Sequence, residues 1–297
     1  MASVVNMLAK EIYTTLDNDF IKPKITDEFY QYMTELAPFL CDNFKKRSMG
    51  LVCDFTETVD CVFTAVFPTE KVILKILENA ENAMLFTHHA CNWDLKKSPI
   101  GFYNMDAALL HKLREKQISI YCLHAPLDNY SEYSTSKTLA DALDIEIISP
   151  FVDYCGTLCG VIGKTKCQTV SELQNKYSEA VGHETRFYQY GDNEINNGVV
   201  AVVAGGGNQT FVLQELLENN TVYFVQSTSI NTFVTGITLK NDVSTEAHEF
   251  AKKNRINIFG GTHYSSEKFA CIAMCKYFEK LGLPAEFIDD EPCIEDM

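Results

Sequence analysis

Met84-Leu-Phe-Thr-His-His-Ala90 joins a short apolar run directly to two adjacent histidines. The apolar residues predict the end of a buried strand, so His88 and His89 are expected where that strand leaves its sheet. Neutral imidazole is a common ligand of borderline divalent metals. Neighbouring residues of an extended segment point to opposite sides, so the pair could bind two different ions. The alternative is two polar residues in a loop, which is common for an isolated His-His pair.

Outward from this strand, segments with strand and helix character alternate along the chain. In the first half, strands are expected over 61–66, 118–124 and 145–148, and helices over 69–80, 106–116 and 137–143. In the second half, strands are expected over 199–204, 222–225, 233–234 and 256–259, and helices over 211–217, 246–253 and 269–281. Thr169-Val-Ser-Glu172 has the capping-box pattern that opens a helix.

The two halves also resemble each other in sequence. Val72-Ile-Leu-Lys-Ile-Leu-Glu-Asn79 aligns with Val212-Leu-Gln-Glu-Leu-Leu-Glu-Asn219, and Ile118-Ser-Ile-Tyr aligns with Ile256-Asn-Ile-Phe. Each half is thus predicted to run strand–helix–strand–helix–strand. The expected fold is α/β, with two repeat-related halves, 1–148 and 149–297, whose mixed sheets are flanked by helices. We expect the halves to pack as one unit with a shared metal site.

The repeat carries polar residues at matching positions. His124-x-x-x-Asp128 follows the last strand of the first unit, and His263-x-x-x-Glu267 follows the last strand of the second. The two motifs align when their distance from the strand is allowed to differ by one residue. Ligands of open α/β sheets gather beyond the carboxyl ends of the strands. A pseudo-twofold axis would therefore bring these four residues around one point, beside the histidine pair.

This pool of four histidines and two carboxylates exceeds the four ligands of one structural zinc. It suits two ions that share a bridging carboxylate. The alternative for each His-x-x-x-carboxylate motif is a surface pair on a helix or an N-terminal cap. His248, one helix before His263, is the best candidate for a supporting role beside a ligand.

Composition and charge restrict the possible functions. The chain has 297 residues, 46% hydrophobic and 22% charged, which are ordinary globular values, and its net charge is −15. This acidic balance argues against direct nucleic-acid binding, which needs Lys and Arg to neutralise phosphates. No apolar run approaches the roughly 20 residues of a membrane span, and no signal-peptide pattern occurs. Eleven scattered cysteines without zinc or redox spacing indicate reduced thiols in a cytoplasmic protein.

The motifs together resemble the Nif-three-like family of dinuclear metal-centre hexameric proteins, often named GTP cyclohydrolase I type 2 homologues. The resemblance covers about residues 50–292 and is carried by four motifs: His88-His89, His124-Ala-Pro-Leu-Asp128, Ala204-Gly-Gly-Gly207 and Gly260-Gly-Thr-His263-Tyr-Ser-Ser-Glu267. It implies metal ligands at His88, His89, Asp128, His263 and Glu267, with Glu267 as the bridge. His124 would lie beside the ions, as a ligand or next to one. The resemblance also implies a toroidal homohexamer. Ile237 departs from the family, where an acidic residue commonly follows the Thr-Gly pair.

Gly205-Gly-Gly207 lies between an expected strand and an expected helix, where backbone amides can bind phosphate. The spacing is not G-x-G-x-x-G, because Thr210 holds the last position. A tight turn packed against a neighbouring helix is therefore the alternative, and we favour it slightly. The cofactor-binding interpretation of Gly205, Gly206 and Gly207 applies if a phosphorylated substrate lies near the metals.

The sequence is consistent with two functions. The first is a metal-dependent hydrolase of a nucleotide or related phosphorylated small molecule, similar to GTP cyclohydrolase type 2. In that case His124 would act as general acid or base, and Glu267 would take part in catalysis as the bridging carboxylate. The second is a non-catalytic metal-storage or delivery protein, or an interaction scaffold. The ligand types suit zinc, iron, manganese, cobalt or nickel.

Overall fold

The computed structural model describes residues 7–223, 230–241 and 244–297. These residues divide into two compact units. Unit 1 comprises residues up to 127, together with 155–157 and 271–291; unit 2 comprises 128–154, 158–270 and 292–297. The chain thus passes from one unit to the other several times, so the compact units are not the consecutive stretches 1–148 and 149–297. That those stretches are two repeats stays a prediction.

Unit 1 is built on a mixed sheet with the strand order β15–β4–β5–β8–β2. The strands are β2 (Gly50–Cys53), β4 (Cys61–Ala65), β5 (Ala83–Thr87), β8 (Ile118–Cys122) and β15 (Ala285–Phe287). Strands β15, β4, β5 and β8 are parallel, and β2 pairs with β8 in the antiparallel sense. The expected strands at 61–66, 84–87 and 118–124 are all present.

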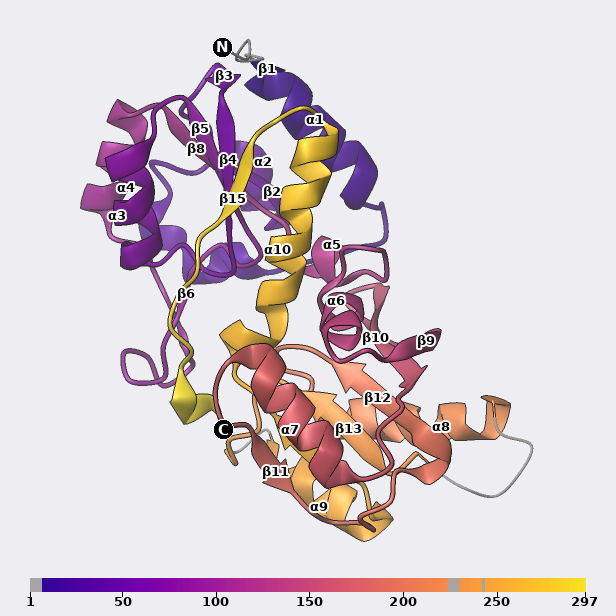
Figure 1. The fold of residues 1–297 in the computed structure, drawn as a ribbon. Coiled ribbons are helices and arrows are strands. Elements are labelled where there is room, and N and C mark those ends of the chain that lie inside the picture. The colour runs from indigo at the N-terminus through magenta and orange to yellow at the C-terminus, as the bar shows by residue number, and fades with distance from the viewer. Residues whose placement is uncertain (1–6, 224–229, 242–243) are drawn as a thin grey trace. The chain divides into compact units, whose positions relative to one another are not determined.

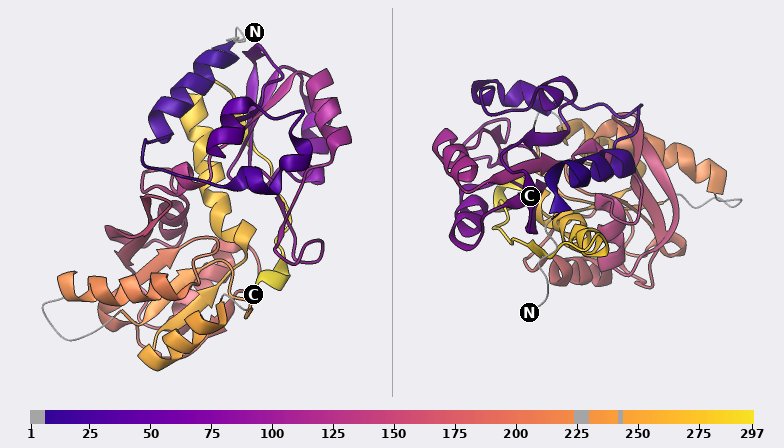
Figure 2. Two further views of the ribbon diagram at one scale, coloured as in Figure 1. Left: turned by 180° about the vertical axis from the view of Figure 1, so that it is seen from behind. Right: turned by 90° about the horizontal axis from the view of Figure 1, so that it is seen from above.

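Helices cover both faces of this sheet, which explains why every residue of β5 and β8 is buried. Helices α3 (Glu70–Asn79) and α4 (Ala107–Glu115) lie on one face (Figure 1), where they share a buried cluster with Leu85 and Ile120. Helices α1 (Ala9–Phe20) and α10 (His263–Lys280) lie side by side in Figures 1 and 2, and Phe278 of α10 packs on Phe86 at the opposite face. Thr69 is the N-cap of α3, because its hydroxyl accepts the Val72 amide.

The remaining elements of unit 1 are short. They are β1 (Met7–Leu8), η1 (Phe29–Tyr32), η2 (Thr34–Leu36), α2 (Asp42–Arg47), β3 (Thr58–Val59), β6 (Asn92–Trp93) and β7 (Phe102–Tyr103).

Unit 2 is built on a second mixed sheet, of order β11–β14–β13–β12–β10–β9. Its strands are β9 (Glu146–Tyr154), β10 (Thr157–Lys164), β11 (Arg186–Tyr188), β12 (Val199–Val203), β13 (Thr232–Thr235) and β14 (Asn257–Gly260). Strands β12, β13 and β14 are parallel, while β10 and β11 are antiparallel to their partners β12 and β14.

Alternate residues of β12 face two different cores in unit 2, as expected for a buried strand. Val199, Ala201 and Val203 join the core with α8 (Thr210–Tyr223) and α9 (Ser244–Asn254). Val200 and Val202 join the core with α6 (Thr135–Ala142) and α7 (Val170–Val181). Thr169 and Glu172 form the predicted capping box at the start of α7. Unit 2 also contains two 3-10 turns, η3 (Asn196–Gly198) and η4 (Ile294–Asp296).

The two sheets contain the same run of elements. Unit 1 runs β4–α3–β5–α4–β8, and unit 2 runs β12–α8–β13–α9–β14, with three parallel strands in sequential order in each. The aligned helical motifs fall in α3 and α8, and the aligned strand motifs fall at β8 and β14. The predicted strand–helix–strand–helix–strand pattern and the mixed α/β fold class are therefore confirmed.

Two local expectations were wrong or incomplete. The strand expected over 222–225 is not formed at 222–223, where α8 continues; residues 224 and 225 lie outside the described residues. The strand expected at 145–148 extends to Tyr154 as β9 and is followed by β10, where no strand was expected. Gly160 and Gly163 weaken the strand pattern of β10 in the sequence, because glycine is uncommon inside strands. The structure explains both glycines, since a Cβ at either position would collide with a neighbouring residue of unit 2.

Candidate metal centre

In unit 1, the three predicted histidines follow the carboxyl ends of two neighbouring parallel strands. The amides of His88 and His89 donate to the carbonyls of Ala65 and Val66, at 3.2 and 2.9 Å, so pairing with the β4 side continues past the end of β5. The Leu123 amide donates to the Thr87 carbonyl at 3.1 Å and places His124 beside the pair. Backbone pairing in the parallel sheet therefore brings the two sequence motifs together.

The imidazoles of His88, His89 and His124 form a compact cluster. Their ring centroids are 4.4 to 5.2 Å apart, and one nitrogen from each lies within 4.8 Å of the others. His88 and His89 are fully buried, and His124 is partly exposed. Three neutral imidazoles at this separation have the donor chemistry that zinc, cobalt or iron prefers, so the residues fit a divalent ion.

Hydrogen bonds fix the tautomer of two of these rings. Nδ1 of His88 lies 3.0 Å from the Leu123 carbonyl, and Nδ1 of His124 lies 3.0 Å from Oδ2 of Asp27. A carbonyl or carboxylate oxygen only accepts, so each Nδ1 carries the proton. In the neutral form of either ring, the lone pair is consequently on Nε2.

Asp27 is a residue that the sequence analysis missed. Its buried carboxylate accepts from the His124 ring and, at 3.1 Å, from the Ala125 amide. Burial raises the pKa of Asp27, but the nearby His124 and the hydrogen bonds from His124, Ala125 and Glu28 outweigh burial and hold that pKa below its usual value. No sequence pattern indicates this contact, because Asp27 precedes His124 by 97 residues in an irregular segment.

Aromatic rings enclose the cluster. Phe67 stacks on His89 at 4.6 Å between centroids, and Phe29 meets His124 edge-on at 4.5 Å. Two thiols also lie nearby, at Cys91 and Cys122. Burial raises the pKa of both thiols, and the Cys122 thiol donates to the His88 carbonyl, so these sulfurs are neutral groups of the core. All eleven cysteines fall within the described residues, and each is a free thiol.

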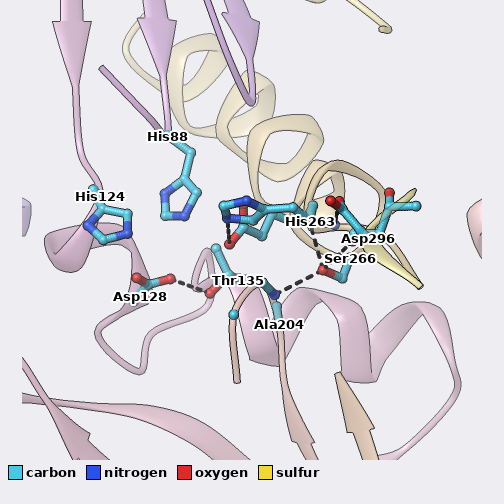
Figure 3. Close-up of polar contacts among 12 residues, drawn as sticks. His88, His124, Asp128, Thr135, Ala204, His263, Ser266 and Asp296 are labelled. Atoms are coloured by element: carbon cyan, nitrogen blue, oxygen red, sulfur yellow. Dashed lines mark hydrogen bonds and ion pairs between the residues drawn. The ribbon is translucent and has the colours of Figure 1, made fainter. Parts of the chain in front are cut away.

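In unit 2, His263 and Glu267 lie on the first turns of α10. Nε2 of His263 is 3.4 Å from Oε1 of Glu267, and both side chains are buried. Asp296 holds the start of this helix: its Oδ2 accepts the His263 amide at 2.7 Å (Figure 3), and its carbonyl accepts the amides of Thr238 and Leu239. Asp296 itself is fully buried.

Asp128 ends the short helix α5 (Ala125–Asp128), one turn after His124. In unit 2 its Oδ1 accepts a 2.6 Å hydrogen bond from the Thr135 hydroxyl (Figure 3), and the side chain is buried. The hydroxyl of Thr135 thus orients a predicted ligand, a role that sequence spacing did not indicate.

The glycine loop after β12 packs against α10 in unit 2. The Gly205 amide donates to the Ser266 hydroxyl at 2.9 Å, and a Cβ built on Gly205 would stand 2.0 Å from Oε1 of Glu267. A Cβ at Gly207 would stand 2.6 Å from Val203, whereas a Cβ at Gly206 would meet nothing within 4 Å. Close packing explains two of the three glycines, and the phosphate-binding interpretation of the loop stays a prediction.

His248, the remaining predicted histidine, contacts residues of unit 2 that are hydrogen-bonded to the start of α10. Its Nε2 lies 2.9 Å from the Thr238 carbonyl, and its Nδ1 lies 3.1 Å from the Tyr190 hydroxyl. Burial lowers the pKa of His248 below the usual value. Because the Thr238 amide in turn donates to Asp296, His248 is connected to the start of α10 by hydrogen bonds. A direct contact of His248 with a ligand stays a prediction.

Comparison with known proteins agrees with the fold. A sequence model described as Duf34/NIF3 (NGG1p interacting factor 3) matches residues 25–292. A GTP cyclohydrolase 1 type 2 homolog from Pyrococcus horikoshii is 26% identical over 271 residues, covering 89% of this chain and 97% of the relative. One from Archaeoglobus fulgidus is 28% identical over 209 residues, covering 69% and 74%.

Solved structures show the same architecture. The protein ybgI, of unknown function, has a TM-score of 0.73 at 18% identity and covers 97% of this chain and 100% of its own. TTHA1606 from Thermus thermophilus has a TM-score of 0.65 at 20% identity, with coverages of 96% and 99%. These identities support the fold alone. Among the described residues, no helix is both long and apolar enough to cross a membrane.

Proposed function

The chain belongs to the Duf34/NIF3 family, and from this we propose that it binds two divalent metal ions and hydrolyses a nucleotide or related phosphorylated small molecule. The observation that supports metal binding best is the cluster of His88, His89 and His124, with ligand atoms within 4.8 Å of one another. The His263–Glu267 pair lies at the equivalent strand end of unit 2 and adds a carboxylate.

We assign the two ions to His88, His89, Asp128, His263 and Glu267, with Glu267 as the shared carboxylate. Chain connectivity supports this assignment, because α5 carries Asp128 one turn beyond His124. Imidazole nitrogen and carboxylate oxygen are ligands for zinc, iron, manganese, cobalt and nickel, and cellular supply selects among these metals.

When bound, two divalent ions supply positive charge that lowers the pKa of a water molecule and stabilises negative charge on a phosphate or ring carbonyl. The chain contributes the positioning. Glu267 takes part as the bridging carboxylate, held against Gly205. His124 presents Nε2, with Nδ1 occupied by Asp27, either as a further ligand or as the atom that moves a proton.

The names of the relatives suggest the substrate class, since they are called homologues of GTP cyclohydrolase 1 type 2. A nucleotide would bring phosphates to the carboxyl edge of a parallel sheet, where such ligands bind. Gly206 is the loop position that packing does not explain, so we assign its backbone to phosphate contact. The family resemblance further suggests a toroidal homohexamer, which light scattering of the purified chain would test.

Metal content is the first measurement, by plasma mass spectrometry on untagged protein prepared without chelator. We expect two transition ions per chain. Loaded protein is then incubated with GTP and other nucleotides, and products are separated by liquid chromatography, with Glu267→Gln as the inactive control. Two ions without turnover of any nucleotide would favour metal storage, delivery or a scaffold role. No metal after anaerobic reloading would refute the proposal.

A further inference from the structure

We infer that unit 2 binds the phosphate groups of a nucleotide or related small molecule through Arg186 and Lys240, two cations that converge on the ring of Tyr188. The inference rests on the proposed function and extends it, because it assigns charged side chains to the phosphates. The guanidinium carbon of Arg186 lies 5.5 Å from the centroid of the Tyr188 ring, and the ammonium nitrogen of Lys240 lies 5.4 Å from it. Both cations are exposed, so an anion can reach them from solvent.

The two cations lie beside the carboxyl ends of the parallel strands of unit 2. Arg186 begins the edge strand β11 and pairs with Gly260, the last residue of β14, three positions before His263. Lys240 follows the last residue of β13 by five positions. Ligands of open α/β sheets collect beyond this edge of the sheet. Both cations are therefore at the edge where the proposed substrate would bind.

Backbone hydrogen bonds fix the segment that precedes Lys240. The Ile237 amide donates to the Gly205 carbonyl at 2.9 Å, so this segment begins against the glycine loop. The amides of the next two residues donate to the carbonyl of Asp296, whose carboxylate accepts the first amide of α10. Lys240 therefore follows a segment that is attached to the glycine loop and to the start of α10, both within unit 2.

The charges of Arg186 and Lys240 are not neutralised by acidic side chains. Among the residues that the structure describes, no carboxylate forms an ion pair with either cation, although the chain has 40 acidic residues against 25 Lys and Arg. Other basic residues of unit 2 do form such pairs: Lys137, Lys176 and Arg255. Two positive charges near one ring repel each other, and a bound anion offsets that repulsion. Phosphate suits the pair, because its oxygens can accept from a guanidinium and an ammonium together.

Tyr188 holds both cations in position. Arg186 and Tyr188 are two residues apart on β11, so their side chains share one face of the sheet. The Tyr188 hydroxyl donates to the Thr238 carbonyl at 3.4 Å, and its ring centroid lies 4.5 Å from that of the buried His248. Cations that stack on this half-buried ring lose less conformational freedom when an anion binds. Tyr188 is thus a positioning residue, which acts on the phosphates through the two cations.

Isothermal titration calorimetry of the metal-free, full-length protein with inorganic tripolyphosphate tests the inference without turnover. We expect the wild type to bind, with an affinity that falls as salt is raised. Arg186→Gln and Lys240→Gln should each weaken binding about 3- to 10-fold, because solvent limits the strength of an exposed charge-assisted hydrogen bond. Lys252→Gln is the matched control, which removes the same charge from an exposed position near the end of α9. It should change the affinity less than about twofold, since salt screens distant exposed charges.

Two further variants separate a binding role from a structural one. Arg186→Lys keeps the charge and should retain more affinity than Arg186→Gln. Tyr188→Leu keeps both charges but removes the ring, and should weaken binding about as much as the loss of one cation. Far-ultraviolet circular dichroism checks that each variant is folded.

The outcomes distinguish this inference from the proposed function. Absence of tripolyphosphate binding in the wild type, or equal affinity in the wild type, Arg186→Gln and Lys240→Gln, would overturn the inference and leave metal binding untouched. Binding of an oligoglutamate peptide in preference to tripolyphosphate would also overturn it, because the cations would then recognise carboxylates. Tripolyphosphate binding in a chain that takes up no metal would instead refute the proposed function alone.

Discussion

Gly205 lies against Glu267 so closely that a Cβ on the glycine would stand 2.0 Å from Oε1 of the carboxylate. The φ angle of Gly205 is +65°, a value that glycine adopts without strain. Position 205 therefore requires glycine for two independent reasons, the positive φ and the close approach of Glu267. One of them directly concerns a proposed metal ligand.

Replacing Gly205 with alanine should both destabilise the chain and displace Glu267. We expect the free energy of unfolding to fall by more than about 1 kcal/mol, because alanine is strained at this φ and its methyl group collides with the carboxylate. Metal affinity should fall as well. Urea denaturation and metal titration measure the two effects. Gly206→Ala is the matched control, since its Cβ would meet no atom within 4 Å; an equal loss there would contradict this explanation.

Replacing Glu267 with alanine should remove metal without unfolding the chain. The carboxylate is buried beside His263. We expect α10 and both sheets to stay folded without it, because Glu267 belongs to neither apolar core of unit 2. Metal analysis by plasma mass spectrometry and circular dichroism of the same sample provide the test. Retention of two ions per chain in this variant would exclude Glu267 as the bridging ligand.

Asp296 is expected to contribute to stability as a cap supplied from far along the chain. Asp296→Ala removes the acceptor of the His263 amide and a negative charge near the start of α10. By analogy with N-cap substitutions, the free energy of unfolding should fall by about 0.5–2 kcal/mol. Thermal or urea unfolding measures this loss. Glu291→Ala, at an exposed position paired with Lys71 at 3.5 Å, should change stability much less.

The free energy of unfolding should depend on pH partly through protonation of His248. Burial lowers the pKa of this imidazole in the folded chain, and Lys240 adds to that effect against the hydrogen bond to Thr238. The unfolded chain therefore binds the proton more readily. The contribution to stability is complete above the unfolded pKa, about 6.5, and is lost as pH falls through the lower folded pKa.

Midpoints of urea unfolding, measured between about pH 8 and pH 5, would test this contribution of His248. We expect the midpoint to decrease toward acid more steeply in the wild type than in His248→Gln, in which position 248 does not titrate. Parallel curves for the two proteins would show that His248 does not contribute.

The sequence by itself determined the local elements and the strand–helix–strand–helix–strand pattern that each unit contains. The apolar run at 84–86 predicted β5, and Ile118-Ser-Ile120 with the residues that follow predicted β8. Thr169 with Glu172 predicted the cap of α7, because capping depends on neighbouring residues. The repeat placed His124 and His263 at equivalent strand ends. Parallel pairing of β5 and β8 then follows from the α/β pattern, and it brings His88, His89 and His124 together in unit 1.

The tertiary structure alone decided which residues hold these histidines. Asp27 reaches His124, and Asp296 reaches His263, across separations of 97 and 33 residues in segments without periodicity. The contact between Gly205 and Glu267 likewise joins a loop to a helix of distant sequence. Hydrogen bonds and close packing between remote segments depend on the folded positions of whole elements. Such contacts leave no spacing in the sequence by which they can be predicted.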